Sequence, residues 1–275
     1  MNYDLPKLVT FDGEARSGKG TVVQATKDYL RDECGYSVML IDAGQVFRVL
    51  VVGATRAGVD MDNPDAIDAF LRNSEEAERC VQLVKSVYHM EKSERDKLLY
   101  TNEVGANSAK IGARPLSQSF KDELLKKWLR DAHSEGYQVV LLDGRALEET
   151  GTMLEREGLS DFALGLYFIC DATVGARRTL GFASTEYHDL TNEQQQAVDE
   201  LVAQITTRNQ ADRERAVQPI VPPAGAPILR LPIIPTNIKF SGIRPMAIID
   251  TSAEMKKNTM TQPVVRFVAD HLKKL

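Results

Sequence analysis

A short glycine-studded segment, residues 13–21 (GEARSGKGT), constrains this chain more than any other feature. It follows a β-rich run at residues 7–11 and precedes an amphipathic stretch with apolar residues at helical spacing. Glycines let a backbone approach its ligand closely, and the N-terminus of the following helix adds N–H donors and a positive dipole. The sequence therefore predicts a loop that cradles a polyphosphate, with Lys19 bridging the β- and γ-phosphates of a nucleoside triphosphate. A chance glycine-rich turn is disfavoured, because such a turn needs neither the strand before it nor the helix after it.

The residue after this lysine narrows the class of phosphate-binding loop. The generic P-loop has Ser or Thr there, and the hydroxyl ligates Mg²⁺. Here Gly20 takes that position and Thr21 follows, so magnesium is expected to rely mainly on phosphate oxygens and water. The GKGT ending is typical of nucleoside monophosphate kinases and less so of GTPases or motor ATPases.

Beyond the loop, the chain alternates between short buried strands and helices. Further strands are predicted at residues 37–41, 138–142, 164–170 and 247–249. This alternation predicts an α/β fold with three layers and a parallel sheet, as in P-loop NTPases. Residues 62–99 have a helical pattern, residues 192–210 that of a polar helix, and the proline-rich residues 219–235 that of an extended or hairpin excursion.

Composition excludes several other classes of protein. The 275 residues are 43% hydrophobic and 27% charged with a formal net charge of −5, which argues against nucleic acid or an anionic membrane as the main partner. Three widely spaced cysteines fit neither a metal site nor a disulfide framework. With no signal peptide and no apolar run of about 18 residues, a cytoplasmic protein is expected. The sequence indicates no oligomeric state.

With the loop identified, other segments resemble the cytidylate kinase family in the family's own order. They are GEARSGKGT (13–21), DAGQVFR (42–48), TNEVGANSA (101–109), VVLLDGR (139–145), YFICDATVGARR (167–178), RNQADRERAVQPIVP (208–222) and IIDTS (248–252). The resemblance implies one P-loop kinase domain over residues 1–275, which uses ATP and Mg²⁺ and acts on small nucleotides. Its parts would be an acceptor-binding insertion at 45–110, a lid region at 180–216, and a C-terminal part of the core at 217–275 with an extra excursion at 225–245.

The resemblance also implies roles for individual residues. Donor nucleotide would be bound by Gly13, Ala15, Arg16, Ser17, Gly18, Lys19, Gly20, Thr21 and Arg177. The acceptor would be bound by Arg48, Lys121, Arg145, Arg208, Asp212 and Arg215. Transfer itself would be assisted by Lys19, Arg145, Arg213 and Arg215. Magnesium or its waters would contact Thr21 and Asp143.

Two of these assignments have support from the residues themselves. Arg208, Asp212 and Arg215 are spaced i, i+4 and i+7, which places them on one face if all three lie in a helix. Asp143 is an acid at the carboxyl end of a predicted strand, where a parallel sheet presents its binding residues. Each arginine alone is more often a solvated surface residue, and only its place in a motif favours phosphate.

Departures from the family concern the acceptor base. Ala43 stands where the family usually has Ser or Thr, Ala146 replaces the acid of a DGRD motif, and Lys121 matches a base-facing arginine. Losing partners for a base edge lowers discrimination between bases, and lysine lacks the guanidinium fork. The helical pattern of residues 62–99 replaces a small β-rich lobe of the bacterial enzymes. The acceptor is therefore not fixed as CMP.

Three functions remain open on the sequence alone. The first is a nucleoside monophosphate kinase that resembles CMP and dCMP kinases. The second is a P-loop kinase of another small phosphorylated or hydroxylated acceptor, which Ala43, Ala146 and the 62–99 segment favour. The third is a regulatory protein that binds nucleotide without catalysis, and the acceptor-side cations argue against it.

Overall fold

The computed structural model describes residues 4–275. The chain forms two compact units. The first contains the residues up to Ile41 together with Leu129–Leu275, and the second contains Asp42–Trp128.

The first unit is built on a six-stranded sheet in the order β2-β3-β1-β4-β6-β5. The strands are β1 (Lys7–Gly13), β2 (Val38–Asp42), β3 (Val139–Asp143), β4 (Asp161–Ile169), β5 (Ile228–Arg230) and β6 (Met246–Asp250). β1 runs parallel to both neighbours, with Phe11 in register with Asp143 on one side and Leu166 on the other. The chain order reverses around β1, and the carboxyl end of a strand at such a switch point is where open α/β sheets bind ligands.

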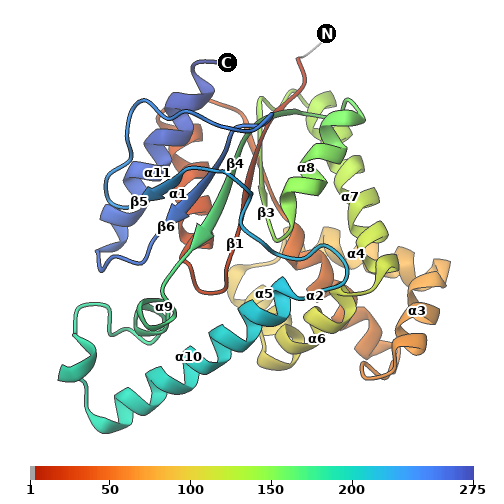
Figure 1. Cartoon of the computed structure of the whole chain (residues 1–275). Coiled ribbons are helices and arrows are strands. Elements are labelled where there is room, and N and C mark those ends of the chain that lie inside the picture. Colours follow the sequence, from red (N-terminus) through yellow and green to blue (C-terminus); the bar gives the residue numbers. More distant parts are fainter. Residues whose placement is uncertain (1–3) are drawn as a thin grey trace. The chain divides into compact units, whose positions relative to one another are not determined.

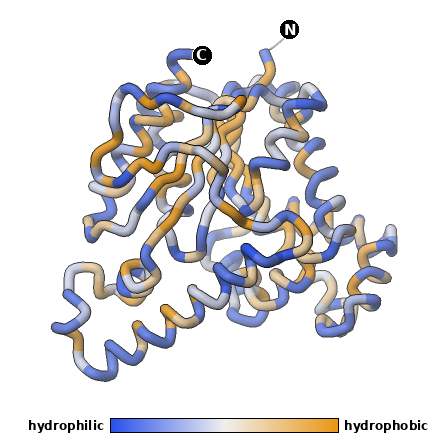
Figure 2. Tube along the Cα trace, in the orientation of Figure 1, coloured by the Kyte–Doolittle hydropathy of each residue, from blue (hydrophilic) through white to orange (hydrophobic). Residues whose placement is uncertain are grey.

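Helices cover both faces of this sheet, which explains why its inner strands are apolar on both sides. α1 (Lys19–Asp32) and α11 (Lys257–Leu272) pack against one another on one face, and α8 (Leu147–Arg156) packs on β1 and β4 on the other (Figure 1). The hydrophobic core between the strands and these helices contains fully buried strand residues, among them Val9, Phe11, Leu141 and Phe168. Figure 2 shows these strands as hydrophobic and α10 (Asn192–Arg213) as mainly hydrophilic. The predicted three-layer fold with a parallel sheet is confirmed.

Between β4 and α10 the chain forms α9 (Ala172–Thr179) and a 3₁₀ turn (Tyr187–Asp189). α10 begins with a capping box in which the Thr191 hydroxyl accepts from Gln194 N–H and the Gln194 side chain accepts from Thr191 N–H. The polar helix predicted at 192–210 is present, and it ends at Arg213, three residues later than expected. Arg215 lies beyond its last turn, so the expectation of three site residues on one helix face is wrong for Arg215.

The proline-rich segment adds a strand to the sheet edge. β5 pairs with β6 in parallel, from Ile228 beside Ile248 to Arg230 beside Asp250. Residues 219–235 contain a single strand, β5, whose partner β6 lies outside the segment. A hairpin needs two paired strands within the segment, so the hairpin alternative is wrong and the segment is an extended excursion that joins the edge.

The second unit is helical. It contains α2 (Ala43–Arg56), α3 (Pro64–Arg72), α4 (Ser74–Tyr88), α5 (Lys92–Leu99), α6 (Asn102–Gly112) and the first part of α7 (Pro115–Ser134). Asn63 and Asn73 cap α3 and α4 by accepting from backbone N–H groups of the first turn. The helical character predicted for residues 62–99 is confirmed.

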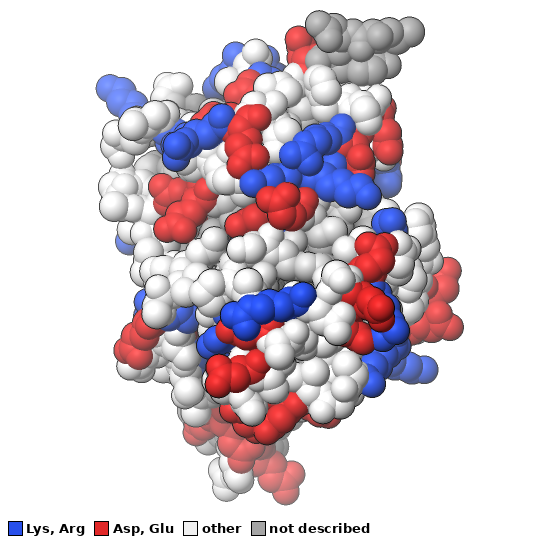
Figure 3. Space-filling view, turned by 90° about the vertical axis from the view of Figure 1, so that its right-hand side faces the viewer, with Lys and Arg blue, Asp and Glu red and all other residues white. Residues whose placement is uncertain are grey.

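Both signs of charge are interspersed on the face drawn in Figure 3. Among residues 4–275, no helix combines the length and the apolar character that crossing a membrane would require.

Gly13 is a position where only glycine fits. Its φ is +138°, and a Cβ placed on it would lie 2.3 Å from the carbonyl oxygen of Phe168 on β4. We expect Gly13→Ala to lower the free energy of unfolding by more than about 2 kcal/mol, because backbone of a central strand cannot move aside. Urea unfolding followed by circular dichroism measures this loss.

Gly20→Ala is the matched control for that substitution. A Cβ on Gly20 meets nothing within 4 Å, and Gly20 lies in the first turn of α1, so alanine should leave stability unchanged or raise it by up to about 1 kcal/mol. Equal midpoints for the two variants would contradict the steric argument.

Candidate active site

The loop predicted to bind phosphate connects β1 to α1. Gly18 has φ +80° and precedes the first turn of α1, and no side chain caps that turn. The first N–H groups of a helix have no partner within the helix. Thr21 N–H donates to the carbonyl of Gly18 at 3.1 Å, so the N–H groups of Lys19 and Gly20 are the ones in the first turn of α1 that are available to an anion. The Ser17 hydroxyl donates to Glu14 O at 2.9 Å, and the Thr251 hydroxyl donates to Ser17 O at 2.9 Å. These two bonds hold the loop against the end of β6.

Lys19 forms an ion pair with Asp143 and donates to the carbonyl of Gly144 at 2.9 Å. The two paired side chains are only 15% and 17% exposed. Asp143 ends β3, the strand beside β1. The ammonium predicted to hold the terminal phosphates and the acid predicted to serve magnesium therefore lie in contact at the carboxyl end of the sheet.

Asp12 ties the loop to the turn after β3. Its carboxylate accepts from Gly13 N–H at 2.6 Å and from Leu147 N–H at 2.7 Å, the first residue of α8. Burial raises the pKa of Asp12, while these hydrogen bonds and the positive charge of Lys19 oppose the rise. The intervening Ala146 has φ +54°, a left-handed conformation that is strained for alanine. Asp12 thus fixes the turn that carries Arg145.

Three arginines gather around a single carboxylate, that of Asp212 near the end of α10. Arg145 forms an ion pair with Asp212, Arg208 Nε lies 3.9 Å from its Oδ2, and Arg215 Nη1 lies 4.0 Å from its Oδ1. Asp212 is 7% exposed. Three guanidinium groups against one carboxylate leave an excess of positive charge, which suits a phosphate dianion.

The like charges in this cluster affect one another. Burial, together with the positive charges of Arg208 and Arg215, lowers the pKa of Arg145 to about 9. Arg145 therefore stays charged at neutral pH, although the surroundings disfavour its charge. An anion placed among the three groups would relieve this repulsion.

The end of α10 also contacts the phosphate loop directly. Asn209 Oδ1 accepts from Ala15 N–H at 2.9 Å, and Arg213 forms an ion pair with Glu14. The Glu14 carboxylate also accepts from Cys170 N–H at 3.4 Å. Arg213 was predicted to assist transfer, and in the structure its ion pair with Glu14 holds it at the loop. Neither Glu14 nor Asn209 was predicted.

Arg177, predicted to bind the donor, is 5% exposed on α9. Its guanidinium lies 3.0 Å from Glu254 and 3.9 Å from Glu186, and it also donates to the carbonyl of Thr185. These contacts join α9 to the segment after β6. Donor binding by Arg177 stays a prediction. Arg16, also predicted, is exposed and has φ +59°.

Two residues that were predicted to bind the acceptor substrate, Arg48 and Lys121, belong to the second unit. Arg48 on α2 donates to the carbonyl of Leu99 at 2.8 Å, and its Cζ lies 4.5 Å from the centre of the Tyr100 ring. Lys121 on α7 is 1% exposed, with its Nζ 3.0 Å from Asp122. Both stay predictions for acceptor binding.

Gln118, one turn before Lys121, is a further candidate that the sequence did not indicate. It is 6% exposed, and its Nε2 donates to the carbonyl of Gly112 at 2.5 Å. That carbonyl can only accept, so the orientation of the amide is fixed and Oε1 points away from it. Within residues 4–275, Oε1 has no hydrogen-bond partner, and such a buried acceptor is costly.

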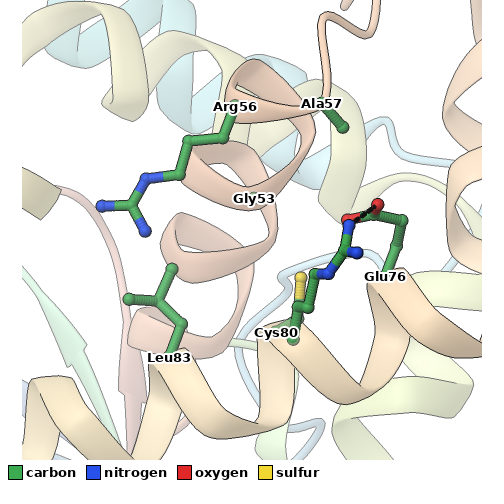
Figure 4. A pocket seen from close by; sticks show the side chains of 7 residues that line it. Gly53, Arg56, Ala57, Glu76, Cys80 and Leu83 are labelled. Carbon is green, nitrogen blue, oxygen red and sulfur yellow. Dashed lines mark hydrogen bonds and ion pairs between the residues drawn. The ribbon is translucent and has the colours of Figure 1, made fainter.

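A separate hollow of about 270 Å³ opens between α2 and α4 in the second unit (Figure 4). Cys80 and Leu83 rise from α4 toward Gly53 on α2. Glu76 and Arg79 also line the hollow and form an ion pair. Burial and the negative charge of Glu76 raise the pKa of the Cys80 thiol to about 11, so this thiol is not a nucleophile at neutral pH. The hollow contains none of the predicted site residues.

The residues at the carboxyl end of the sheet fit a nucleotide and magnesium. Backbone N–H groups, one ammonium and several guanidinium groups are partners for phosphate, and a carboxylate beside a hydroxyl-bearing loop is the oxygen chemistry of Mg²⁺. Within residues 4–275, no cluster of three or more His, Cys, Asp or Glu side chains forms a ready-made metal cage. Magnesium usually keeps waters and binds through one or two carboxylates and substrate phosphates.

Fold and site together define a P-loop phosphotransferase. The family model for cytidylate kinase matches residues 9–231. A cytidylate kinase of Pseudomonas putida strain W619 is 26% identical over 232 residues, covering 82% of this chain and 88% of the relative. One from Shewanella pealeana is 26% identical over 247 residues (88% and 93%), and one from Bacillus pumilus 24% over 219 residues (77% and 83%).

The chain belongs to the cytidylate kinase family. It is a phosphotransferase of the nucleoside monophosphate kinase type. The resemblance identified from its motifs is therefore confirmed.

Asp212 should matter for stability because it compensates three cations. We expect Asp212→Asn to lower the free energy of unfolding by roughly 2–4 kcal/mol, since it leaves buried positive charge uncompensated. Sulfate, a dianion, should restore more stability to the variant than it adds to the parent protein at equal ionic strength. Urea unfolding with sulfate or chloride measures both effects.

Asp199→Asn is the control on the same helix. The carboxylate of Asp199 is exposed and accepts from the Tyr187 hydroxyl at 2.8 Å, so its loss should cost less than about 1 kcal/mol. If both variants unfolded at the same urea concentration as the parent, charge compensation by Asp212 would be refuted.

Proposed function

We propose that the chain transfers the γ-phosphoryl group of ATP, with Mg²⁺, to a nucleoside monophosphate, and that CMP and dCMP are its acceptors. The observation that carries this proposal is the cluster of cations at the carboxyl end of the sheet: Lys19 in the loop, and Arg145, Arg208 and Arg215 around Asp212. Phosphoryl transfer depends on positioning and on positive charge around the oxygens of the transferred group.

The residues act by exchanging partners. Lys19 would leave Asp143 for the β- and γ-phosphates. Asp143 and Thr21 are the residues that would then hold magnesium or its waters. Magnesium, when bound, neutralises phosphate charge. An oxygen of the acceptor's phosphate attacks the γ-phosphorus as the bond to the β-phosphate oxygen breaks. Arg145, Arg213 and Arg215 stabilise the negative charge that builds up between donor and acceptor.

We also assign a role to each part of the chain and to the residues that bind the donor. Residues 45–110 bind the acceptor, with Arg48 on its phosphate, and residues 180–216 form a lid that carries Arg208, Asp212, Arg213 and Arg215. Residues 217–275, with the excursion at 225–245, complete the core. Gly13, Ala15, Arg16, Ser17, Gly18, Gly20 and Arg177 join Lys19 in holding the donor.

A buried hydrogen-bond acceptor in the second unit, the side-chain oxygen of Gln118, supports cytosine as the base of the substrate. Gln118 Oε1 faces no donor in this state, and the exocyclic amino group of cytosine is such a donor. Uracil has a carbonyl at the same ring position, and two acceptors would repel each other. The covering side chains must move for a base to reach Gln118. Its amide would partly replace the partners lost at Ala43 and Ala146, with Lys121 beside it.

A second candidate is a P-loop kinase of another small phosphorylated or hydroxylated acceptor. It is favoured by Ala43 and Ala146 and by the three helices that residues 62–99 form, α3, α4 and α5. A thermal-shift screen of metabolites, in the presence of a nonhydrolysable ATP analogue, would identify such an acceptor.

Turnover should depend on the loop lysine. In a coupled assay of ADP release with the common nucleoside monophosphates, we expect activity with CMP and dCMP, and a loss of at least about 100-fold in kcat for Lys19→Ala. Lys27→Ala, on the same helix outside the loop, should stay within about twofold of the parent. No turnover with any monophosphate would refute the proposal.

Discrimination between bases should depend on Gln118. We expect Gln118→Leu to raise the KM for CMP by about tenfold and to leave the KM for UMP unchanged or lower, because only CMP loses a hydrogen bond to a buried group. Ser119→Ala, an exposed neighbour on α7, is the control. An equal rise for both nucleotides would show that Gln118 supports the fold and does not read the base.

A further inference from the structure

Tyr100 joins three residues of the 42–48 segment. Its ring lies under the guanidinium of Arg48, with 4.5 Å from Cζ to the ring centre. Its hydroxyl donates to Asp42 Oδ2 at 3.3 Å and also forms a side-chain hydrogen bond with Gln45. All four residues belong to the second unit.

The end of α5 places this ring. α5 ends at Leu99, and Tyr100 is the residue that caps it. The last carbonyls of a helix have no partner within the helix, and the carbonyl of Leu99 accepts from Arg48 Nη1 at 2.8 Å. One helix end therefore gives Arg48 both a carbonyl and an aromatic face.

These contacts fix the orientation of Arg48 without neutralising it. Among residues 4–275, no carboxylate lies within ion-pair distance of Arg48, whereas Lys19, Arg145 and Arg213 each pair with one. An aromatic face attracts a guanidinium and restricts its plane but leaves its edge N–H groups available to an anion.

The hydroxyl anchors the ring to the start of α2. Asp42 caps α2 by accepting from Gln45 N–H at 3.2 Å, so the phenol bonds to a side chain that is already fixed. Burial and the negative charge of Asp42 raise the pKa of Tyr100. The phenol is therefore neutral and remains a donor at physiological pH.

We propose that Tyr100 is a positioning residue for the acceptor: it holds the guanidinium of Arg48 in a preset plane that meets the phosphate monoester of the incoming nucleotide. This inference rests on the proposed role of Arg48 in binding that phosphate. It gives the 62–99 segment a function, because α5 delivers the ring.

Three variants test the proposal by kinetics with CMP. Tyr100→Leu should raise the KM for CMP by about fivefold or more, and should leave the KM for ATP and the kcat within about twofold. Tyr100→Phe keeps the ring and should stay closer to the parent. Tyr88→Leu removes an exposed tyrosine of α4 in the same unit and should change neither KM.

A double-mutant cycle separates positioning from general support of the fold. In an Arg48→Ala background, Tyr100→Leu should have no further effect on the KM for CMP. The same fold-change with and without Arg48 would overturn the proposal, and so would an unchanged KM for CMP in Tyr100→Leu.

Binding without turnover distinguishes failure of this inference from failure of the proposed reaction. If the parent protein turned over no monophosphate, the rise in Tm caused by CMP would still be measured for the parent, Tyr100→Leu and Arg48→Ala. A rise that both substitutions diminish supports positioning of a phosphate monoester by Arg48 and Tyr100. No rise in the parent, or an equal rise in all three, overturns it.

Discussion

The structure of the candidate active site depends on the pairing of cations with the protein's own carboxylates. Lys19 pairs with Asp143, Arg145 with Asp212, and Arg213 with Glu14. A buried cation without such a partner would cost several kcal/mol. On the proposed function, these acids hold the cations at the places that phosphates would take. On the same proposal, an arriving phosphate displaces some of these acids from their cations, so binding is in part an exchange of anions.

This exchange has different consequences at the three pairs. Asp143, once released by Lys19, is a carboxylate at a strand end, where it can serve magnesium. Asp212 faces three guanidinium groups and can stay in place while a second anion joins the cluster. Glu14 sits within the phosphate loop, and its charge opposes a polyphosphate. The pair with Arg213 and the bond from Ala15 N–H to Asn209 hold the end of α10 on the phosphate loop. Arg48 follows another principle, since a ring and a carbonyl orient it without removing its charge.

The sequence predicted the parts of the molecule that are set by local patterns. The loop at 13–21, the strands beside it and the helical 62–99 segment follow from periodicity and from the conformations that glycine allows. It also predicted that Arg208 and Asp212 would meet, because i and i+4 are neighbours on a helix. It was wrong about why Arg215 joins them. α10 ends at Arg213, so Arg215 reaches Asp212 from the chain that follows the helix.

Contacts between distant segments could not be predicted in the same way. Glu14 and Arg213 are 199 positions apart, and nothing in the local sequence of either indicates the pair. Gln118 and Tyr100 were missed for a similar reason. Glutamine on a helix and tyrosine after one are ordinary residues, and only the tertiary structure shows the buried amide oxygen of the first and the guanidinium stacked on the second. Sequence patterns identify the phosphate loop because its backbone conformation requires particular residues. Recognition of a base requires no particular backbone conformation, so the side chains that contact the base can be replaced one at a time.

That difference explains why this chain can keep its reaction class while its base contacts differ. Phosphate is recognised by charge and by backbone N–H groups, and losing any of these affects the chemistry itself. A base edge is recognised by a few side-chain hydrogen bonds, and losing one changes only the preference between substrates. On the proposed function, Ala43 and Ala146 fall in the second category, and Lys19, Arg145 and Asp212 in the first. Alanine at both positions removes hydrogen-bond partners and leaves no unpaired polar group behind, so it relaxes selection without penalising any particular base. On the proposed function, discrimination comes from groups that are buried and unsatisfied until the right substrate binds, and the amide oxygen of Gln118 is a buried acceptor of this kind.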